Sequence, residues 1–413
     1  MPAPMTPRPR QPHLLTVTLM AGTAVLSLNM IVPAFGEMAS HFGVSYATIS
    51  FLFSGYLIIT GLLTLVAGPL SDRFGRRPIA LVGLVLFVLA SLVCVVTPNL
   101  TVLYIARIAQ TVVVCSAVIS QAVIRDTSDS AANTTRRMAS VAMVMGLAPL
   151  IGPTIGGVLS DLLGWRSVFG AQALVGLVAL VLVWFDLAET NQHKSSTFRA
   201  QVRDYPSLIQ SARFWGYVMT LCFGVSTFFA FLAGMPLIGE AEFQLTQTQV
   251  GMVLGTLTVG YIVANAITRQ AADHLRASTL MVIGRLIGLL GASLSLALLF
   301  LGFSSAVVLI APLILLGAAN GFSVQPSHAG VVSVNPRLAG SAAGLSGALV
   351  YWVGAAAASL MSLMLSSNPS PRLFIWMLLV STVLALVPAL FVMALDRRSA
   401  CDGLGMAAPD SRE

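Results

Sequence analysis

A charged side chain, Arg107, interrupts a long apolar run in this sequence, within the string IARIAQ (105–110). The surrounding run, 100–124, exceeds the ~20 apolar residues that a bilayer-spanning helix needs. An arginine near the centre of such a helix costs at least ~2.5 kcal/mol on insertion scales, and one that is retained usually marks a functional site. Arg107 can snorkel to the membrane surface, pair with a carboxylate or bind an anion. We expect it to face an internal cavity.

The composition indicates a membrane protein. Of the 413 residues, 57% are hydrophobic and only 9% are charged, against about 25% charged residues in a soluble domain. The net charge of +7 comes from basic residues scattered through short loops, without the basic face of a nucleic-acid-binding protein. Cys94, Cys115 and Cys222 lie in apolar runs and no CxxC pair occurs. We therefore predict neither disulfides nor a metal site.

Twelve apolar runs predict an all-α membrane protein with twelve transmembrane helices. No Asp or Glu falls within these runs, although the chain has 15 acidic residues. The longest internal polar stretch, 188–212, separates six runs from six. It predicts two six-helix pseudo-repeats, 1–187 and 213–413, joined by a cytoplasmic linker. The expected spans are 14–35, 46–70, 78–97, 100–124, 138–160, 167–185, 213–238, 247–268, 278–301, 305–332, 339–366 and 372–395.

The distribution of basic residues predicts the orientation of the chain. With the N-terminus in the cytoplasm, all but four of the 22 Lys and Arg residues fall in cytoplasmic segments. Arg166 and Arg372 are then external, and Arg107 and Arg285 lie within spans. The positive-inside rule therefore predicts that both termini are cytoplasmic. Arg285 lies toward the inner end of its span, so we expect it to snorkel.

The loop between the second and third runs reads GPLSDRFGRRP, residues 68–78. Glycine permits close helix approach and tight turns, and a carboxylate accepts strong hydrogen bonds from a neighbouring helix end. We interpret this loop as a charged latch between helix ends, rather than only a positive-inside loop. The latch residues are Gly68, Asp72, Arg73, Gly75, Arg76 and Arg77.

This latch loop resembles the signature G-x-x-x-D-R-x-G-R-R of the major facilitator superfamily at every specified position. The resemblance implies twelve helices in two halves. It also implies that Asp72 and the three arginines hold the halves together on the cytoplasmic side in the outward-open state.

The run 138–160 contains a second match. Its residues Gly152, Pro153, Gly156 and Gly157 reproduce the G-P-x-x-G-G core of the superfamily's antiporter motif, which is found in exporters. Small residues also recur every four positions, and they make one helix face flat enough for another backbone to pack closely. These residues are Ala148, Gly152, Gly156 and Ser160.

Arg107 lies in a third match. The string LYIARIAQ resembles the L-x-x-x-R-x-x-Q pattern of drug:proton antiporters, with Leu103, Arg107 and Gln110 in register. Within the superfamily, the chain is most similar to the bicyclomycin and chloramphenicol resistance type. Antiporters of this type usually carry an acid in the first helix, in a pattern like D-M-x-x-P, where this chain reads N-M-I-V-P from Asn29. Asn29 cannot carry a proton at physiological pH.

Three explanations of Arg107 remain open at this point. A carboxylate near a helix end, Glu37 or Asp126, carries the proton in place of the missing acid. Alternatively, the cargo is an anion that pairs with Arg107, or the protein is not coupled to protons. His328 is a further titratable candidate.

The resemblance implies that helices 1, 4, 7 and 10 line a central cavity. Besides Asn29 and Gln110, the candidates for its wall are Phe228, Phe231, Met235, Asn320 and Gln325. Methionine and phenylalanine provide an adaptable apolar surface for varied lipophilic molecules.

Together these features predict an inner-membrane exporter of small lipophilic drugs or metabolites that works by alternating access, with proton exchange as the family default. The alternative is an uncoupled or differently coupled transporter of an anionic solute that uses Arg107 as counter-charge. A polytopic membrane enzyme is a distant alternative, because the sequence has no HExxH, GxSxG or CxxC motif. We expect a monomer in the lipid bilayer that binds a small molecule, without cofactor or nucleic acid.

Overall fold

The computed structural model describes residues 10–191, 208–335 and 338–405, and it is helical throughout these ranges. Twelve of its helical segments are long and apolar enough to cross a membrane. The predicted all-α fold with twelve spans is therefore confirmed. Most of the predicted linker 188–212, namely residues 192–207, lies outside the described residues.

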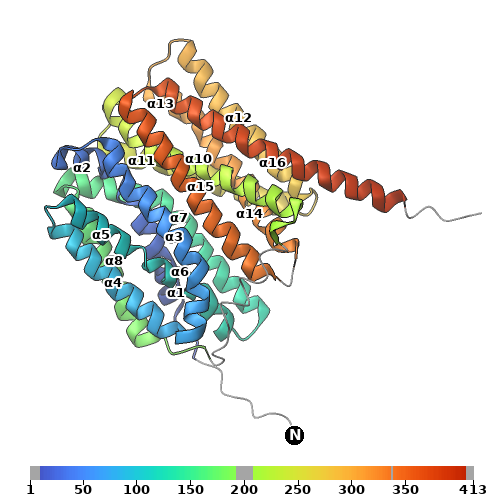
Figure 1. The fold of residues 1–413 in the computed structure, drawn as a ribbon, viewed down its shortest axis with the longest axis horizontal. Coiled ribbons are helices and arrows are strands. Elements are labelled where there is room, and N and C mark those ends of the chain that lie inside the picture. Colours follow the sequence, from blue (N-terminus) through green and yellow to red (C-terminus); the bar gives the residue numbers. More distant parts are fainter. Residues whose placement is uncertain (1–9, 192–207, 336–337, 406–413) are drawn as a thin grey trace, which may run out of the picture.

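The first six spans contain α1 to α8 and the last six contain α10 to α16 (Figure 1). The bounds are α1 Leu14–Asn29, η1 Val32–Ala34, α2 Phe35–Phe42, α3 Tyr46–Phe74, α4 Arg76–Val96, α5 Leu100–Gln110, α6 Val113–Thr127, α7 Ala131–Leu163, α8 Arg166–Asp186, α10 Ala212–Phe243, α11 Gln247–Ala271, α12 Ala277–Phe300, α13 Ala306–Ile310, η2 Ala311–Leu313, α14 Ile314–Ser333, α15 Ala339–Ser367 and α16 Pro371–Gly405.

Several helices extend beyond the apolar runs that predicted them. α7 begins at Ala131 and α10 continues to Phe243, because helices end where caps and turns satisfy the backbone and not where hydropathy falls. The predicted ranges were too short in consequence. Eight acidic residues, Glu37, Asp161 and Glu240 among them, lie within the spanning helices. All eight lie toward the helix ends, beyond the predicted apolar runs, so the expectation of spans free of acids is wrong there.

The first span is interrupted just after Asn29. α1 ends there, and Pro33 lies in the first turn of the short η1 helix that leads into α2. Proline removes a backbone donor and cannot continue a helix smoothly. We call the end of the bundle that holds α2 the far end, and the end where α1 begins the terminal end.

Close backbone contacts join the two groups of six spans. α7 packs along α11, and α3 packs along α15 (Figure 1). A Cβ atom on Gly157 would lie 2.3 Å from the carbonyl oxygen of Gln247, and one on Gly251 would lie 2.4 Å from that of Pro153. These distances exclude any larger residue without a shift of the backbone, so glycine sets the separation of α7 and α11.

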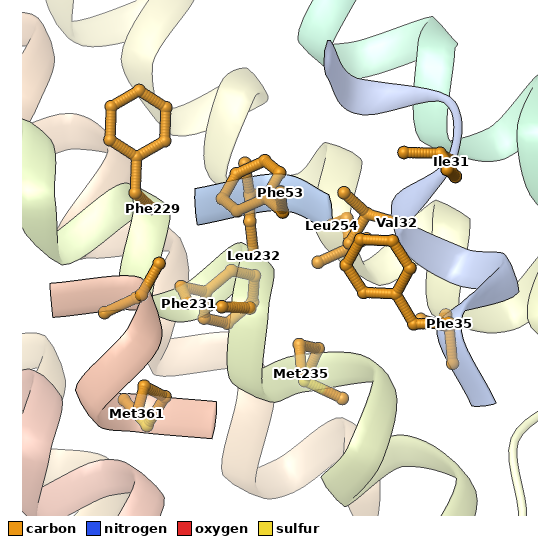
Figure 2. Close-up of a cluster of buried hydrophobic side chains, with 14 of the residues drawn as sticks. Ile31, Val32, Phe35, Phe53, Phe229, Phe231, Leu232, Met235, Leu254 and Met361 are labelled. Atoms are coloured by element: carbon orange, nitrogen blue, oxygen red, sulfur yellow. The ribbon is translucent and has the colours of Figure 1, made fainter. Parts of the chain in front are cut away.

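Figure 2 shows the apolar cluster that fills the space between the two groups. Phe53 of α3 lies near Phe231 of α10, and Phe35 of α2 lies beside Leu254 of α11. Met235 of α10 belongs to the same cluster. Both α10 side chains are 0% exposed. Phe231 and Met235, two candidates for the cavity wall, are therefore packed within the apolar cluster in this conformation, and their contact with cargo stays a prediction.

The glycine contact can be tested by blocking it. We expect Gly157→Val to open the far end, because the added carbons overlap the Gln247 backbone. The measurement is maleimide alkylation of Val250→Cys, a fully buried position on α11, in a chain whose native cysteines are replaced by serine. We expect alkylation at least tenfold faster than without the valine.

Gly146→Val on the same helix is the matched control, since a Cβ there meets nothing within 4 Å. An equal alkylation rate in both variants would show that the contact at Gly157 does not hold the far end closed.

Candidate functional site

Arg107 lies at the centre of a buried polar network in the first six spans. It is 1% exposed. Its Nη1 donates to Ser27 Oγ at 3.1 Å and to Gln110 Oε1 at 2.8 Å, and its Nη2 donates to the Ser27 carbonyl at 2.8 Å. The Tyr56 ring lies 4.3 Å from the guanidinium carbon. The guanidinium is therefore enclosed by protein and does not snorkel.

The network continues from Gln110 into two further helices. Its Nε2 donates to Ser91 Oγ of α4 at 2.6 Å and to Gln172 Oε1 of α8 at 3.2 Å. Gln172 in turn donates to the Ser27 carbonyl at 3.2 Å. Arg107 and Gln110, which belong to the same L-x-x-x-R-x-x-Q pattern, are thus in direct contact. Ser27, Ser91 and Gln172 were missed, because nothing in their local sequence sets them apart from ordinary small or polar residues in a helix.

The acceptors around Arg107 are all neutral oxygen atoms. A buried charge is costly unless hydrogen bonds and a counter-charge compensate it. Here α1, α5 and the Tyr56 ring of α3 supply dipoles and a π-face but no negative charge. Arg107 therefore retains a capacity to attract an anion.

Asn29 is the last residue of α1, directly before the break in the first span. Its Nδ2 donates to the Val25 carbonyl at 2.7 Å, while its buried Oδ1 has no hydrogen-bond partner. The flat face of α7 packs beside it, since a Cβ on Gly152 would lie 3.6 Å from Asn29 Cβ. Asn29 is therefore held between α1 and α7 as a neutral residue.

Two other glycines of the antiporter motif, Gly156 and Gly157, contact different helices. A Cβ on Gly156 would lie 1.8 Å from the Met30 carbonyl oxygen, whereas one on Gly157 meets α11. Ser160, on the same face as Gly152 and Gly156, donates to Glu37 at 2.7 Å. The predicted close packing on this face is confirmed, and its partner is the broken first span.

Carboxylates from both groups of spans meet at the far end. Glu37 of α2 accepts from Ser160 Oγ and, at 3.2 Å, from Gln247 Nε2 of α11. The Glu240 carboxylate of α10 lies against Gly36, where a Cβ would be 1.7 Å from its Oε2. The buried Glu240 Oε1 has no hydrogen-bond partner. Glu37 is one of the carboxylates predicted from the sequence. Glu240 is not, because it follows the predicted span 213–238, whereas α10 continues to Phe243.

Asp161 fixes the start of α11 at the same end. It accepts from the backbone N–H of Gln247 at 3.2 Å and of Thr248 at 2.8 Å, and from the Thr248 hydroxyl. A carboxylate at a helix N-terminus satisfies free N–H groups and favours the helix dipole. Asp161 therefore binds α7 to α11 beside the two glutamates.

The latch loop lies at the terminal end and is tied to its own six spans. Arg76 pairs with Asp72 at 3.1 Å and makes a short contact with Asp126 at the end of α6. Gly75 has a φ of 100°, which favours glycine. Arg73 lies over the Phe74 ring at 5.3 Å, and Gly68 has open space where a Cβ would be.

Glu189, just after α8, completes this loop. Its carboxylate accepts from the backbone N–H groups of Arg76 at 3.0 Å and Arg77 at 3.2 Å, and so caps the start of α4. Arg77 also donates to the Trp184 carbonyl. Glu189 was not predicted from the sequence, because it lies over 100 residues from Arg76 along the chain. Asp126, one of the two candidate proton carriers, is an ion-pair partner of the latch loop in this conformation.

The last six spans contain a second buried guanidinium, on Arg285 of α12. It is 2% exposed and donates to Asn320 Oδ1 of α14 at 3.1 Å. The expectation that Arg285 snorkels is therefore wrong, because Gly224 of α10 leaves room for the guanidinium against its backbone. The remaining cavity candidates differ in exposure. Gln325 is exposed and Phe228 is half-buried, and His328 on α14 is exposed.

Solved structures share this arrangement of helices. The chain superposes on a bacterial homolog of the human lysosomal transporter Spinster, solved in an inward-facing, unoccupied conformation, with a TM-score of 0.73 at 11% identity, covering 93% of this chain and 96% of the other. It also superposes on a D-xylose-proton symporter with a TM-score of 0.71 at 15% identity, covering 92% and 96%. The chain therefore shares its fold with these two structures.

Sequence comparison identifies the family. Residues 17–359 match the Major Facilitator Superfamily, and the chain belongs to it. It is 26% identical to a bicyclomycin resistance protein homolog of Haemophilus influenzae, over 87% of this chain and 91% of the relative. It is 28% identical to multidrug resistance protein D of Escherichia coli, over 90% and 94%. A chloramphenicol resistance protein of Pseudomonas aeruginosa is 25% identical, over 74% and 73%.

The Arg107 network makes a prediction about stability. We expect Arg107→Lys to lower the free energy of unfolding by about 1.5–3 kcal/mol, the range for a hydrogen bond to a charged group. A lysine ammonium cannot reproduce the planar fork that reaches both Ser27 and Gln110. The measurement is denaturant unfolding of the purified protein in detergent. Arg269→Lys, at an exposed site, is the control, and equal stability of the two variants would contradict the network.

Proposed function

We propose that the protein exports small lipophilic molecules across a bacterial inner membrane by alternating access, in exchange for protons. The observation that carries the proposal is the placement of Glu37 and Glu240 at the closed far end, one from each group of six spans. Glu37 accepts from Gln247, and Glu240 lies against Gly36, the residue before Glu37. In the orientation predicted by the positive-inside rule, with both termini cytoplasmic, this end faces outward. The described conformation is then inward-facing.

Closure of the far end changes the surroundings of Glu240. Its Oε1 is buried without a hydrogen-bond partner in the closed end, and a buried charge without partners is costly, so closure favours a proton bound to Glu240. Opening that end moves α2 away from α10, lets water reach Glu240 and favours proton loss. Protons from outside therefore promote the return to the inward-facing state, which is the step an exporter must drive. The pair Glu37 and Glu240 takes the place of the acid that Asn29 lacks.

The cargo class is supported by the relatives and by the residues around the centre. Relatives are named for resistance to bicyclomycin and chloramphenicol and for multidrug resistance. Phe228, Phe231 and Met235 on α10 become available to cargo when the far end opens, and apolar side chains of this kind adapt to varied shapes. One chain supplies both groups of spans, so a monomer suffices.

A specific observation favours the second candidate, a transporter of anionic solutes. Arg107 and Arg285 are both buried, and their hydrogen-bond acceptors are neutral oxygens. An interior with two such guanidiniums attracts negative cargo. In this candidate Arg107 is the counter-charge and the flux does not depend on protons.

Proton coupling is tested in everted vesicles with an acidic interior, by adding lipophilic cations, neutral compounds and anions. We expect at least one class to cause proton release, and Glu240→Gln to reduce that release at least tenfold. Glu242→Gln, exposed and two residues further along α10, is the matched control. Uptake of labelled compound without proton release would refute antiport, and uptake of anions alone would establish the second candidate.

The role of Asp126 is tested separately. We expect Asp126→Asn to slow transport several-fold, because it breaks the ion pair with Arg76, while the number of protons released per molecule transported stays unchanged. A changed proton ratio would instead make Asp126 a proton carrier. Vesicle flux and proton release, measured on the same preparation, give both quantities.

A further inference from the structure

We propose that a crevice on the bilayer-facing side of α3 and α5 binds the anionic head group of a single-chain amphiphile. The crevice is a cavity of about 220 Å³ between α3, α5 and α15. The inference rests on the membrane placement of these helices. It depends neither on the direction of transport nor on proton coupling.

The inner wall of the crevice carries unused hydrogen-bonding capacity. Arg107 and Ser54 both line it, and each is 1% exposed. Arg107 Nε and Ser54 Oγ are buried and have no hydrogen-bond partner. An unpaired buried donor costs free energy, and one on a charged group costs more. A ligand that accepts from both groups removes this cost.

The mouth of the crevice is apolar. Phe51 and Ile58 of α3 are 42% and 49% exposed, and Ile108 of α5 is 44% exposed. Leu62 and Ile105 extend this exposed apolar surface along the same two helices. On a spanning segment such a surface faces hydrocarbon. The ligand therefore arrives from the bilayer and not from water.

The size of the cavity limits what enters. A pocket that encloses a drug-sized molecule has roughly 300–1,000 Å³, whereas this one has about 220 Å³. The head group and the first carbons fit, and the remaining chain lies among the lipids. Apart from Arg107, the residues that line the crevice are uncharged, so the head group that complements it is an anion such as a carboxylate.

Gly55 makes the crevice testable without disturbing the fold. It lines the cavity, and a Cβ built on it meets nothing within 4 Å. Gly55→Leu therefore fills the crevice without a clash. Gly170→Leu on α8 is the matched control, because its Cβ also meets nothing within 4 Å.

Trp352 of α15 reports on binding, since its Nε1 donates to the carbonyl of Ile58 at the mouth, at 3.1 Å. The full chain is placed in lipid nanodiscs and titrated with 2-bromodecanoate, whose bromine quenches nearby tryptophan. The quenching assigned to Trp352 is the difference between the protein and its Trp352→Phe variant. Decanoate, decanol and decylammonium, at matched membrane concentrations, compete for the site.

We expect saturable quenching of Trp352 that decanoate reverses and that decanol and decylammonium leave in place. Gly55→Leu should weaken binding at least tenfold, and Gly170→Leu should bind like the unmodified chain. Equal competition by decanol would show an apolar groove without anion selectivity, and unchanged binding in Gly55→Leu would place the site elsewhere. Either result overturns the proposal, and neither depends on transport in vesicles.

Discussion

The first six spans are organised around one constraint, the burial of a guanidinium with no carboxylate beside it. Arg107 can stay charged in a low-dielectric interior only if many dipoles point at it. Ser27 on α1 and Gln110 on α5 supply them directly, and Ser91 and Gln172 hold Gln110 in place from α4 and α8. Four helices are thereby fixed relative to one another by polar contacts that lipid cannot replace.

The contact between the two groups of spans follows a different rule. It relies on glycine, which lets α7 and α11 approach until backbone meets backbone. Apolar side chains from α2, α3 and α10 then fill the far end. A glycine and apolar contact has few hydrogen bonds to break, which suits a joint that must open and close. The hydrogen bonds that cross it include those of Glu37 and Asp161 with the start of α11. The buried Tyr46 hydroxyl also donates to the Ala233 carbonyl at 2.8 Å, and Ser50 contacts Ser362.

The Arg107 network and the contact between the two groups of spans have different roles. The Arg107 network rigidifies one group of spans, whereas the charges that change with proton binding in the proposed mechanism lie between the groups. In that mechanism the proton is bound by the pair Glu37 and Glu240 and not by an acid at the position of Asn29. The pair lies where closure of the far end changes its surroundings. The latch loop, with Arg76 paired to Asp72 and Asp126, belongs wholly to the first six spans and the start of the linker in this conformation.

The sequence by itself determined the twelve spans and the family motifs, and it placed Arg107 and Gln110 in one motif, because hydropathy and helical spacing are local properties. It did not reveal Glu240 within a spanning helix, since helix ends depend on caps and neighbours. It misjudged Arg285, because only packing shows that Gly224 leaves room to bury it. Ser27, Ser91 and Gln172 were also beyond reach. Only the tertiary structure decides which ordinary polar residues, 19 to 145 positions apart along the chain, meet around one buried charge.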